Sequence, residues 1–80
     1  MTRYFFHLRR NGDLVRDSEG DEFASLDDAR SNAVKAVQEM VAARIKGGQP
    51  IPDEHIEVCN GAGDLQFSIS FRAVVREHLK

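Results

Sequence analysis

The sequence predicts a two-layer α+β domain of order β-β-α-β-β, in which one helix packs on one face of a four-stranded antiparallel sheet. Two segments alternate apolar and polar side chains with a period of two, and each leads to a glycine-containing turn. A long alanine-rich segment between them repeats its apolar residues with the period of a helix. Because no repeat or change in composition divides the chain, we expect one domain over residues 1–80.

The first hairpin lies at the start of the chain. Its first strand is expected to turn one set of side chains toward the core (Tyr4, Phe6 and Leu8) and the alternate set toward the other face (Arg3, Phe5, His7 and Arg9). Asn11 and Gly12 tolerate the positive φ angles that a two-residue type I′ turn requires. Residues 14–17 should therefore return as a second antiparallel strand, with Val15 opposite Leu8.

The central helix is expected to begin at Leu26 and to end near Lys46. Ser25 and Asp28 have the spacing of a capping box, in which each side chain accepts from a backbone N–H of the first turn. Gly47 suits the left-handed position after a helix, and the prolines that follow prevent continuation. One broad apolar side should face the sheet: Leu26, Ala29, Ala33, Val34, Ala36, Val37, Met40, Val41 and Ile45.

A second hairpin follows the helix. In its first strand Ile56 and Val58 are expected to face the core, and His55, Glu57 and Cys59 the other side. A glycine-rich turn occupies residues 60–64. The next strand alternates most cleanly and should bury Leu65, Phe67, Ile69 and Phe71. Residues 72–80 fit a short C-terminal helix of one or two turns.

Composition narrows the classes of function. A formal net charge of -2 and a pI near 5.8 disfavour binding to nucleic acid or to an anionic membrane through overall charge. No apolar run approaches the roughly 20 residues of a membrane helix, and one cysteine, Cys59, excludes an internal disulfide. We therefore expect a cytoplasmic protein that makes no membrane contact. A chain this small is also expected to gain stability by pairing with a second copy.

Two clusters of titratable residues are candidates for chemistry, and neither matches a known site. The acidic segment 13–28 lacks the spacing of an EF-hand calcium loop. His55, Glu57 and Cys59 lack the P-C-x-x-C segment that completes the metal site of zinc deaminases. We therefore expect a solvated acidic turn and a polar sheet face, with no catalytic residue, no metal and no cofactor.

The first strand and its turn carry a candidate interaction surface, formed by Arg3, Phe5, His7, Arg9 and Arg10. A phenylalanine on an otherwise polar face costs about 2 kcal/mol if it stays in water. We therefore expect Phe5 to be covered by the C-terminal segment, by a second copy of the chain or by another protein partner.

These observations favour a non-enzymatic interaction or regulatory module that forms a homodimer. One alternative is a nucleic-acid-associated regulator that uses the arginine-rich first hairpin, although the aromatic spacing of RNP motifs is missing. Another alternative is a small metal-dependent or hydrolytic enzyme that uses His55, Glu57 and Cys59. A flat strand face without an oxyanion hole disfavours the hydrolase.

One pattern extends over nearly the whole chain: RYFFHLR at residues 3–9, a glycine at 12, D-x-E-G-x-E at 17–22, the alanine-rich helix, IEV at 56–58 and the strand at 65–71. The pattern resembles a small family of uncharacterised alphaproteobacterial proteins that is catalogued as a domain of unknown function. The resemblance implies a bacterial, cytoplasmic, stand-alone domain, and it implies no particular activity, cofactor or partner.

Overall fold

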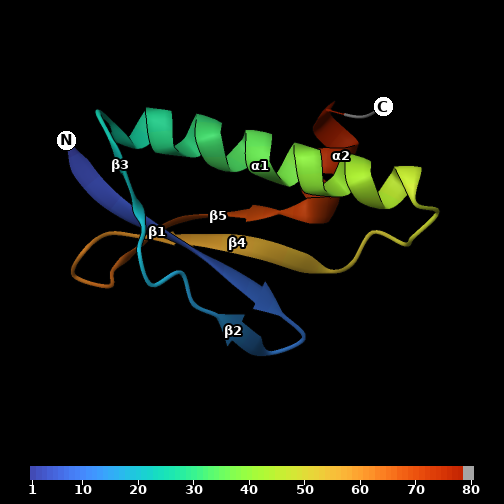
Figure 1. Ribbon diagram of the computed structural model, residues 1–80, viewed down its shortest axis with the longest axis horizontal. Helices are drawn as coiled ribbons and strands as arrows, with labels where there is room; N and C mark the ends of the chain where they lie inside the picture. Colours follow the sequence, from blue (N-terminus) through green and yellow to red (C-terminus); the bar gives the residue numbers. More distant parts are fainter. Residues whose placement is uncertain (79–80) are drawn as a thin grey trace.

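The α+β prediction is confirmed by the computed structural model, which describes residues 1–78, apart from the side chain of residue 78 (Figure 1). Seven elements follow one another along the chain: β1 (Thr2–Arg10), β2 (Asp13–Val15), β3 (Asp21–Phe23), α1 (Leu26–Lys46), β4 (Glu54–Cys59), β5 (Leu65–Ser70) and α2 (Phe71–His78). The long helix α1 lies across the sheet, and α2 packs against α1 on the same side (Figure 1). In the described part of the chain, neither helix is both long and apolar enough to cross a membrane.

The antiparallel sheet has five strands, so the predicted count of four was one short. Its order is β2-β1-β4-β5, and β3 pairs with the first residues of β1. β3 could not be predicted from alternation because it has only three residues, of which Asp21 and Glu22 are acidic. The nine-residue strand β1 therefore has β4 along one edge and two short strands in succession along the other.

The first hairpin forms as predicted around a turn in which Asn11 has φ 48° and Gly12 has φ 87°. Leu8 lies opposite Val15, which is the predicted register. The second strand is shorter than predicted and ends at Val15 rather than at Asp17. The reason is that the Asp17 side chain, instead of the backbone of a longer strand, accepts the next hydrogen bond from β1.

Helix α1 has the predicted limits, from Leu26 to Lys46. The Ser25 side chain caps it by accepting from the backbone N–H of Asp28 at 3.1 Å. The helix ends at Lys46 as predicted, but the left-handed residue lies one position later than predicted: Gly47 has φ -82°, and Gly48 has φ 70°.

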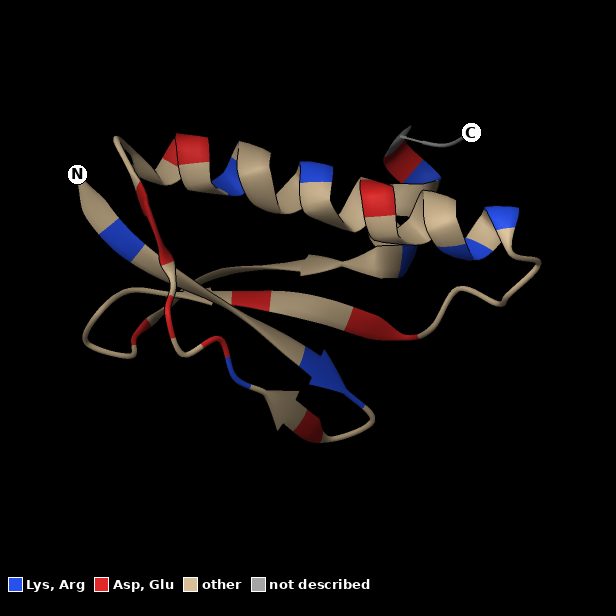
Figure 2. Cartoon of the chain, viewed as in Figure 1, with Lys and Arg blue, Asp and Glu red and all other residues tan. Residues whose placement is uncertain are grey.

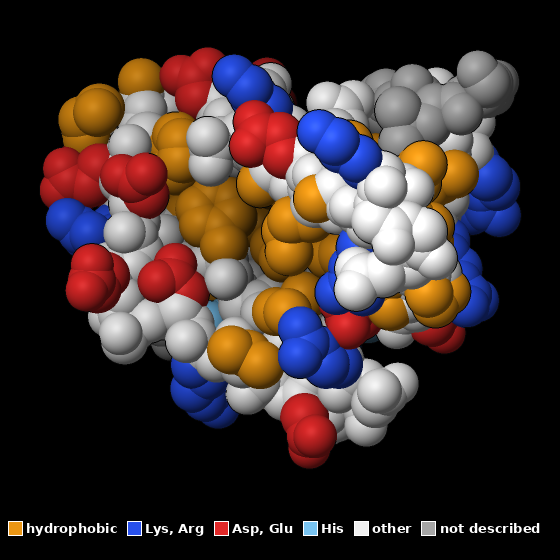
Figure 3. Space-filling model, turned by 45° about the vertical axis from the view of Figure 1, so that its right-hand side comes forward, with side chains coloured by type: hydrophobic (Ala, Val, Ile, Leu, Met, Phe, Trp, Pro, Cys, Tyr) orange, Lys and Arg blue, Asp and Glu red, His pale blue; other side chains and the backbone are white. Residues whose placement is uncertain are grey.

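The buried side of α1 is narrower than predicted. Four residues spaced four apart are buried: Ala29, Ala33, Val37 and Val41. Of the remaining predicted core positions, Val34 is half-buried, and the others are exposed: Leu26, Ala36, Met40 and Ile45. The buried side is narrow because the sheet contacts only one side of α1 and α2 contacts α1 only next to that side. Figure 3 shows hydrophobic side chains that reach the surface in a hollow, with acidic side chains along one flank.

The second hairpin and α2 complete the core. Ile56, Val58, Phe67 and Ile69 are buried, as predicted. Two other predictions for this region were wrong. Leu65 is 59% exposed, because it pairs with Cys59 beyond an irregularity in the register. Phe71 is fully buried but belongs to the first turn of α2 rather than to a strand. Of the predicted C-terminal helix, residues 79–80 lie outside the described residues.

One charged side chain lies within this packing. Glu54, at the start of β4, is 5% exposed and forms ion pairs with Arg10 at 2.8 Å and Arg44 at 3.5 Å. Figure 2 shows the acidic start of β4 between the basic ends of β1 and α1. These three charged side chains therefore connect the end of β1, the end of α1 and the start of β4.

Candidate functional site

The polar face of the sheet, opposite the helices, holds most of the predicted candidate residues. Cross-strand pairing between β1 and β4 places Arg9 opposite His55, His7 opposite Glu57 and Phe5 opposite Cys59. On the next strand, Ser68 and Ser70 continue the same face. The sheet thus adds His7 of β1 to the face of β4 that carries His55, Glu57 and Cys59, a neighbourhood that the sequence left open.

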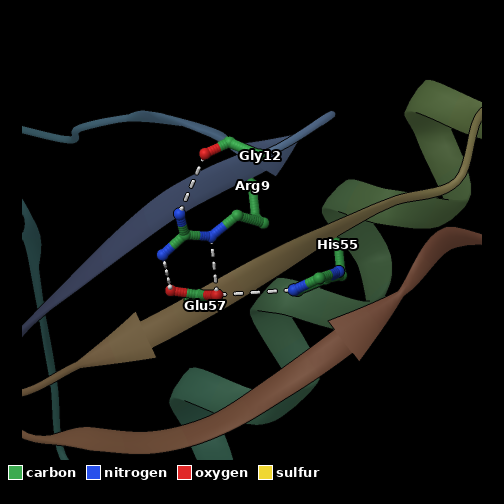
Figure 4. A network of polar contacts seen from close by, with 4 residues as sticks. All are labelled: Arg9, Gly12, His55 and Glu57. Atoms are coloured by element: carbon green, nitrogen blue, oxygen red, sulfur yellow. Dashed lines mark hydrogen bonds and ion pairs between the residues drawn. The ribbon is translucent and has the colours of Figure 1, made fainter.

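The centre of this face is an ion-pair network around Glu57 (Figure 4). Arg9 donates from Nε to Oε2 of Glu57 at 3.1 Å and from Nη2 to Oε1 at 3.3 Å. Its remaining Nη1 donates to the carbonyl of Gly12 at 3.5 Å, and Nε2 of His55 lies 3.4 Å from Oε2 of Glu57. The hydrogen bonds from Arg9 lower the pKa of Glu57, against the effect of burial. A carboxylate held in this way is a poor proton donor, so the network is suited to structure rather than to acid–base catalysis.

A loop crosses the same face beside β1, and we call residues 17–20 the strap. Asp17 accepts at Oδ2 from the backbone N–H of Phe6 at 3.1 Å, and at Oδ1 from those of Glu19 at 3.3 Å and Gly20 at 3.1 Å. Its own N–H donates to Nδ1 of His7 at 3.0 Å. Burial tends to raise the pKa of Asp17, but the backbone donors outweigh burial and lower it. Asp17 is therefore an ordered clamp, whereas the other acids of this segment are exposed, as the sequence suggested.

The strap lies against Phe5. A Cβ atom at Gly20 would stand 2.9 Å from the Phe5 ring and 2.7 Å from the carbonyl oxygen of Tyr4, so the backbone of the strap touches both. Phe5 is half-buried, and its ring stacks beside His7 with centroids 6.4 Å apart. The expectation that the C-terminal segment covers Phe5 was wrong, because α2 packs with α1 against the other side of the sheet.

The arginines of the predicted interaction surface are engaged with acidic partners. Arg3 donates to the carbonyl of Glu19 at 2.7 Å and forms an ion pair with Glu22 at 3.2 Å. Arg10 is paired with Glu54, whereas Arg9 is paired with Glu57 on the polar face. These pairs neutralise much of the positive charge that a nucleic-acid interface would need.

The thiol of Cys59 is buried, and its pKa is raised by burial and by the nearby charge of Glu57. A thiol in this state has little of the thiolate that nucleophilic attack and metal binding require. Among the side chains that the structure describes, no three of His, Cys, Asp or Glu stand close enough together to hold a metal ion.

A feature that sequence reasoning missed lies at the edge of the sheet. A groove of about 330 Å³ runs between α1, α2 and the outer edge of β5, with Ser68 and Ser70 on its wall. Arg30 flanks the groove with its guanidinium 4.3 Å from the centre of the Phe67 ring, and Glu77 lines it from α2. The sequence does contain a sign that this strand is unusual: Leu65–Ser70 has no charged residue, in a chain that is 30% charged.

Comparison with known proteins gives one result. No curated protein and no solved structure matches the chain. A family model matches residues 3–72, which include all of α1 and every strand except the first residue of β1. The resemblance found in the sequence is thereby confirmed for most of the chain. The chain belongs to the family described as Domain of unknown function (DUF6894).

Proposed function

We propose that the protein is a non-enzymatic interaction module that pairs with a second copy of itself along the outer edge of β5. The observation that carries this proposal is the composition of that edge. Within residues 1–78, no strand pairs with the outer side of β5. Natural proteins protect an exposed sheet edge with charged residues or proline. The six residues of β5 include neither.

The opposite edge of the sheet differs in strand length and in charge. It is built from β2 and β3, which have three residues each and include Asp13, Asp21 and Glu22. Short, charged edge strands discourage pairing with another chain. The contrast supports β5 as the strand that adds a partner, because strand addition uses the unpaired N–H and C=O groups of an exposed edge.

A second copy fits this edge by symmetry. An antiparallel pair of β5 strands reverses the direction of the second copy, so both copies present the same uncharged edge to each other. The small size of the chain adds support, because an 80-residue domain buries only about 60% of its unfolded surface.

The absence of catalysis is part of the proposal. Glu57 is held by Arg9 and the Cys59 thiol is buried, so neither is available as a proton carrier or nucleophile. The bacterial cytoplasm is the setting that we propose, since the resemblance implies it and a single buried thiol suits a reducing compartment.

Light scattering of the wild type and two lysine variants tests the proposal. The wild type should have about twice the 9.0 kDa of one chain. Ser68→Lys places like charges at the paired edges and should give a monomer with an unchanged circular dichroism spectrum. Ser31→Lys is the matched control, because Ser31 is also exposed but lies on α1. A wild type that stays monomeric at high concentration contradicts the pairing.

A further inference from the structure

The contact between His7 and the strap fixes the protonation state of the histidine. The backbone N–H of Asp17 donates to Nδ1 of His7 at 3.0 Å, so Nδ1 must carry a lone pair. The ring is then neutral, with its proton on Nε2. A second proton would enter at Nδ1 and set two N–H groups against each other.

This contact lies where β1 has no strand beside it. β2 pairs with β1 from Leu8 onward, and β3 pairs with it only as far as Tyr4. Across the gap, the backbone N–H of Phe6 donates to the Asp17 carboxylate. The strap is therefore held to β1 through two acceptors, the Asp17 carboxylate and Nδ1 of the His7 ring.

Among the charged groups around His7, the Asp17 carboxylate interacts with a charge on His7, which helps to lower the pKa of Asp17. Glu57 faces His7 from β4 but is engaged with Arg9 and His55. The Asp17 carboxylate already accepts three backbone hydrogen bonds. A like charge lies on Arg9, two residues along the same face of β1, and Arg16 directly precedes the strap in the chain.

We infer that His7 is an acid-sensitive latch for the strap. When His7 takes up a second proton, the N–H of Asp17 loses its acceptor, and the strap loosens from β1. Because Gly20 touches the Phe5 ring, loosening of the strap uncovers an apolar side chain on the polar face.

Amide hydrogen exchange measured by NMR at pH 7.5 and pH 5, corrected for the chemical exchange rate, tests the latch. For the wild type, protection of the Asp17 and Gly20 amides should fall about fivefold or more at pH 5, as expected for the loss of one hydrogen bond. The amide of Val58, in the core of β4, should keep its protection and serves as the internal reference.

Two variants separate the latch from a general effect of acid. His7→Asn places an amide oxygen near the position of Nδ1 and does not titrate, so protection of the strap should be similar at both pH values. His7→Gln places its amide nearer the position of Nε2 and should leave the strap loosened at both. Circular dichroism verifies that each variant folds. A His7→Asn variant that follows the wild-type pH dependence overturns the latch, as does a wild type whose strap is equally protected at both pH values.

The ring nitrogens of wild-type His7 provide a test that needs no variant. Their ¹⁵N chemical shifts at pH 7.5 should show a proton on Nε2 and none on Nδ1. A neutral ring protonated at Nδ1 contradicts the geometry on which the latch depends. These measurements do not depend on the oligomeric state, so the latch and the pairing of β5 can fail separately.

Discussion

The carboxylate of Glu54 lies 2.8 Å from Nε of Arg10, although the Glu54 side chain is only 6% exposed and that of Arg10 is 47% exposed. The pair is therefore asymmetric. Removal of Arg10 leaves a buried carboxylate with Arg44 at 3.5 Å as its remaining partner, whereas removal of the negative charge leaves two arginines that reach water. Because an unpaired buried charge is costly, the two deletions should differ.

We expect Arg10→Met to lower the free energy of unfolding by about 1–3 kcal/mol, and Glu54→Gln to lower it by less. Urea unfolding at neutral pH measures both. The double variant should be no less stable than Arg10→Met alone, since it no longer contains the unpaired carboxylate. Equal losses in the two single variants would show that the carboxylate does not depend on Arg10.

Three glycine substitutions should form a graded series. Gly20→Ala should destabilise most, because Gly20 has φ 68° and a Cβ would stand 2.7 Å from the Tyr4 carbonyl oxygen. Gly12→Ala adds only the left-handed strain of about 1–2 kcal/mol, since nothing lies within 4 Å of the new atom. Gly61→Ala has neither problem and should change stability by less than about 0.5 kcal/mol. Chemical denaturation that places Gly12→Ala below Gly20→Ala in stability would contradict the close contact of the strap.

Acid should destabilise the protein through Asp17 and Glu57. The folded structure lowers the pKa of both carboxyl groups, so their contribution to stability is present above the ordinary carboxyl pKa of about 4. This contribution to stability is lost as the pH falls through the lowered pKa values that the two groups have in the folded protein. The melting temperature of the wild type should thus decrease below about pH 4. Asp17→Asn should flatten this part of the curve, and an unchanged slope would mean that Asp17 titrates normally.

Cys59 should react slowly with a thiol reagent in the native protein. Its side chain is buried, and its raised pKa keeps the thiol protonated. A disulfide reagent at pH 8 should therefore label the unfolded protein promptly. It should label the folded protein only as fast as the structure around Cys59 opens. Prompt labelling of all the folded protein would place the thiol at the surface.

Local patterns in the sequence were sufficient to predict most of the fold. The period-2 alternation around Phe6 and around Phe67 located both hairpins, and the Ser25 cap located the start of α1. These features depend on residues close together in the chain. By contrast, β3 exists because residues 21–23 pair with the first residues of β1, and that pairing depends on the strap.

The site was harder to predict than the fold. The alternation of side chains placed His55, Glu57 and Cys59 on one face of a strand. It did not predict that the strap passes beside that face. Asp17 looked like one acid among many, and its role follows from the gap between two short strands along β1. The outer position of β5 likewise follows from strand order, which short-range patterns do not determine.

Pairing along β5 can be observed directly in a mixture of isotope-labelled and unlabelled protein. Isotope-filtered NOE spectroscopy reports contacts between the two kinds of copy only. Such contacts are expected among Phe67, Ser68 and Ile69, with the two β5 strands antiparallel to each other. A dimer whose contacts between copies lie elsewhere, such as on α1, or a sample with no contacts between copies, would contradict the pairing along β5.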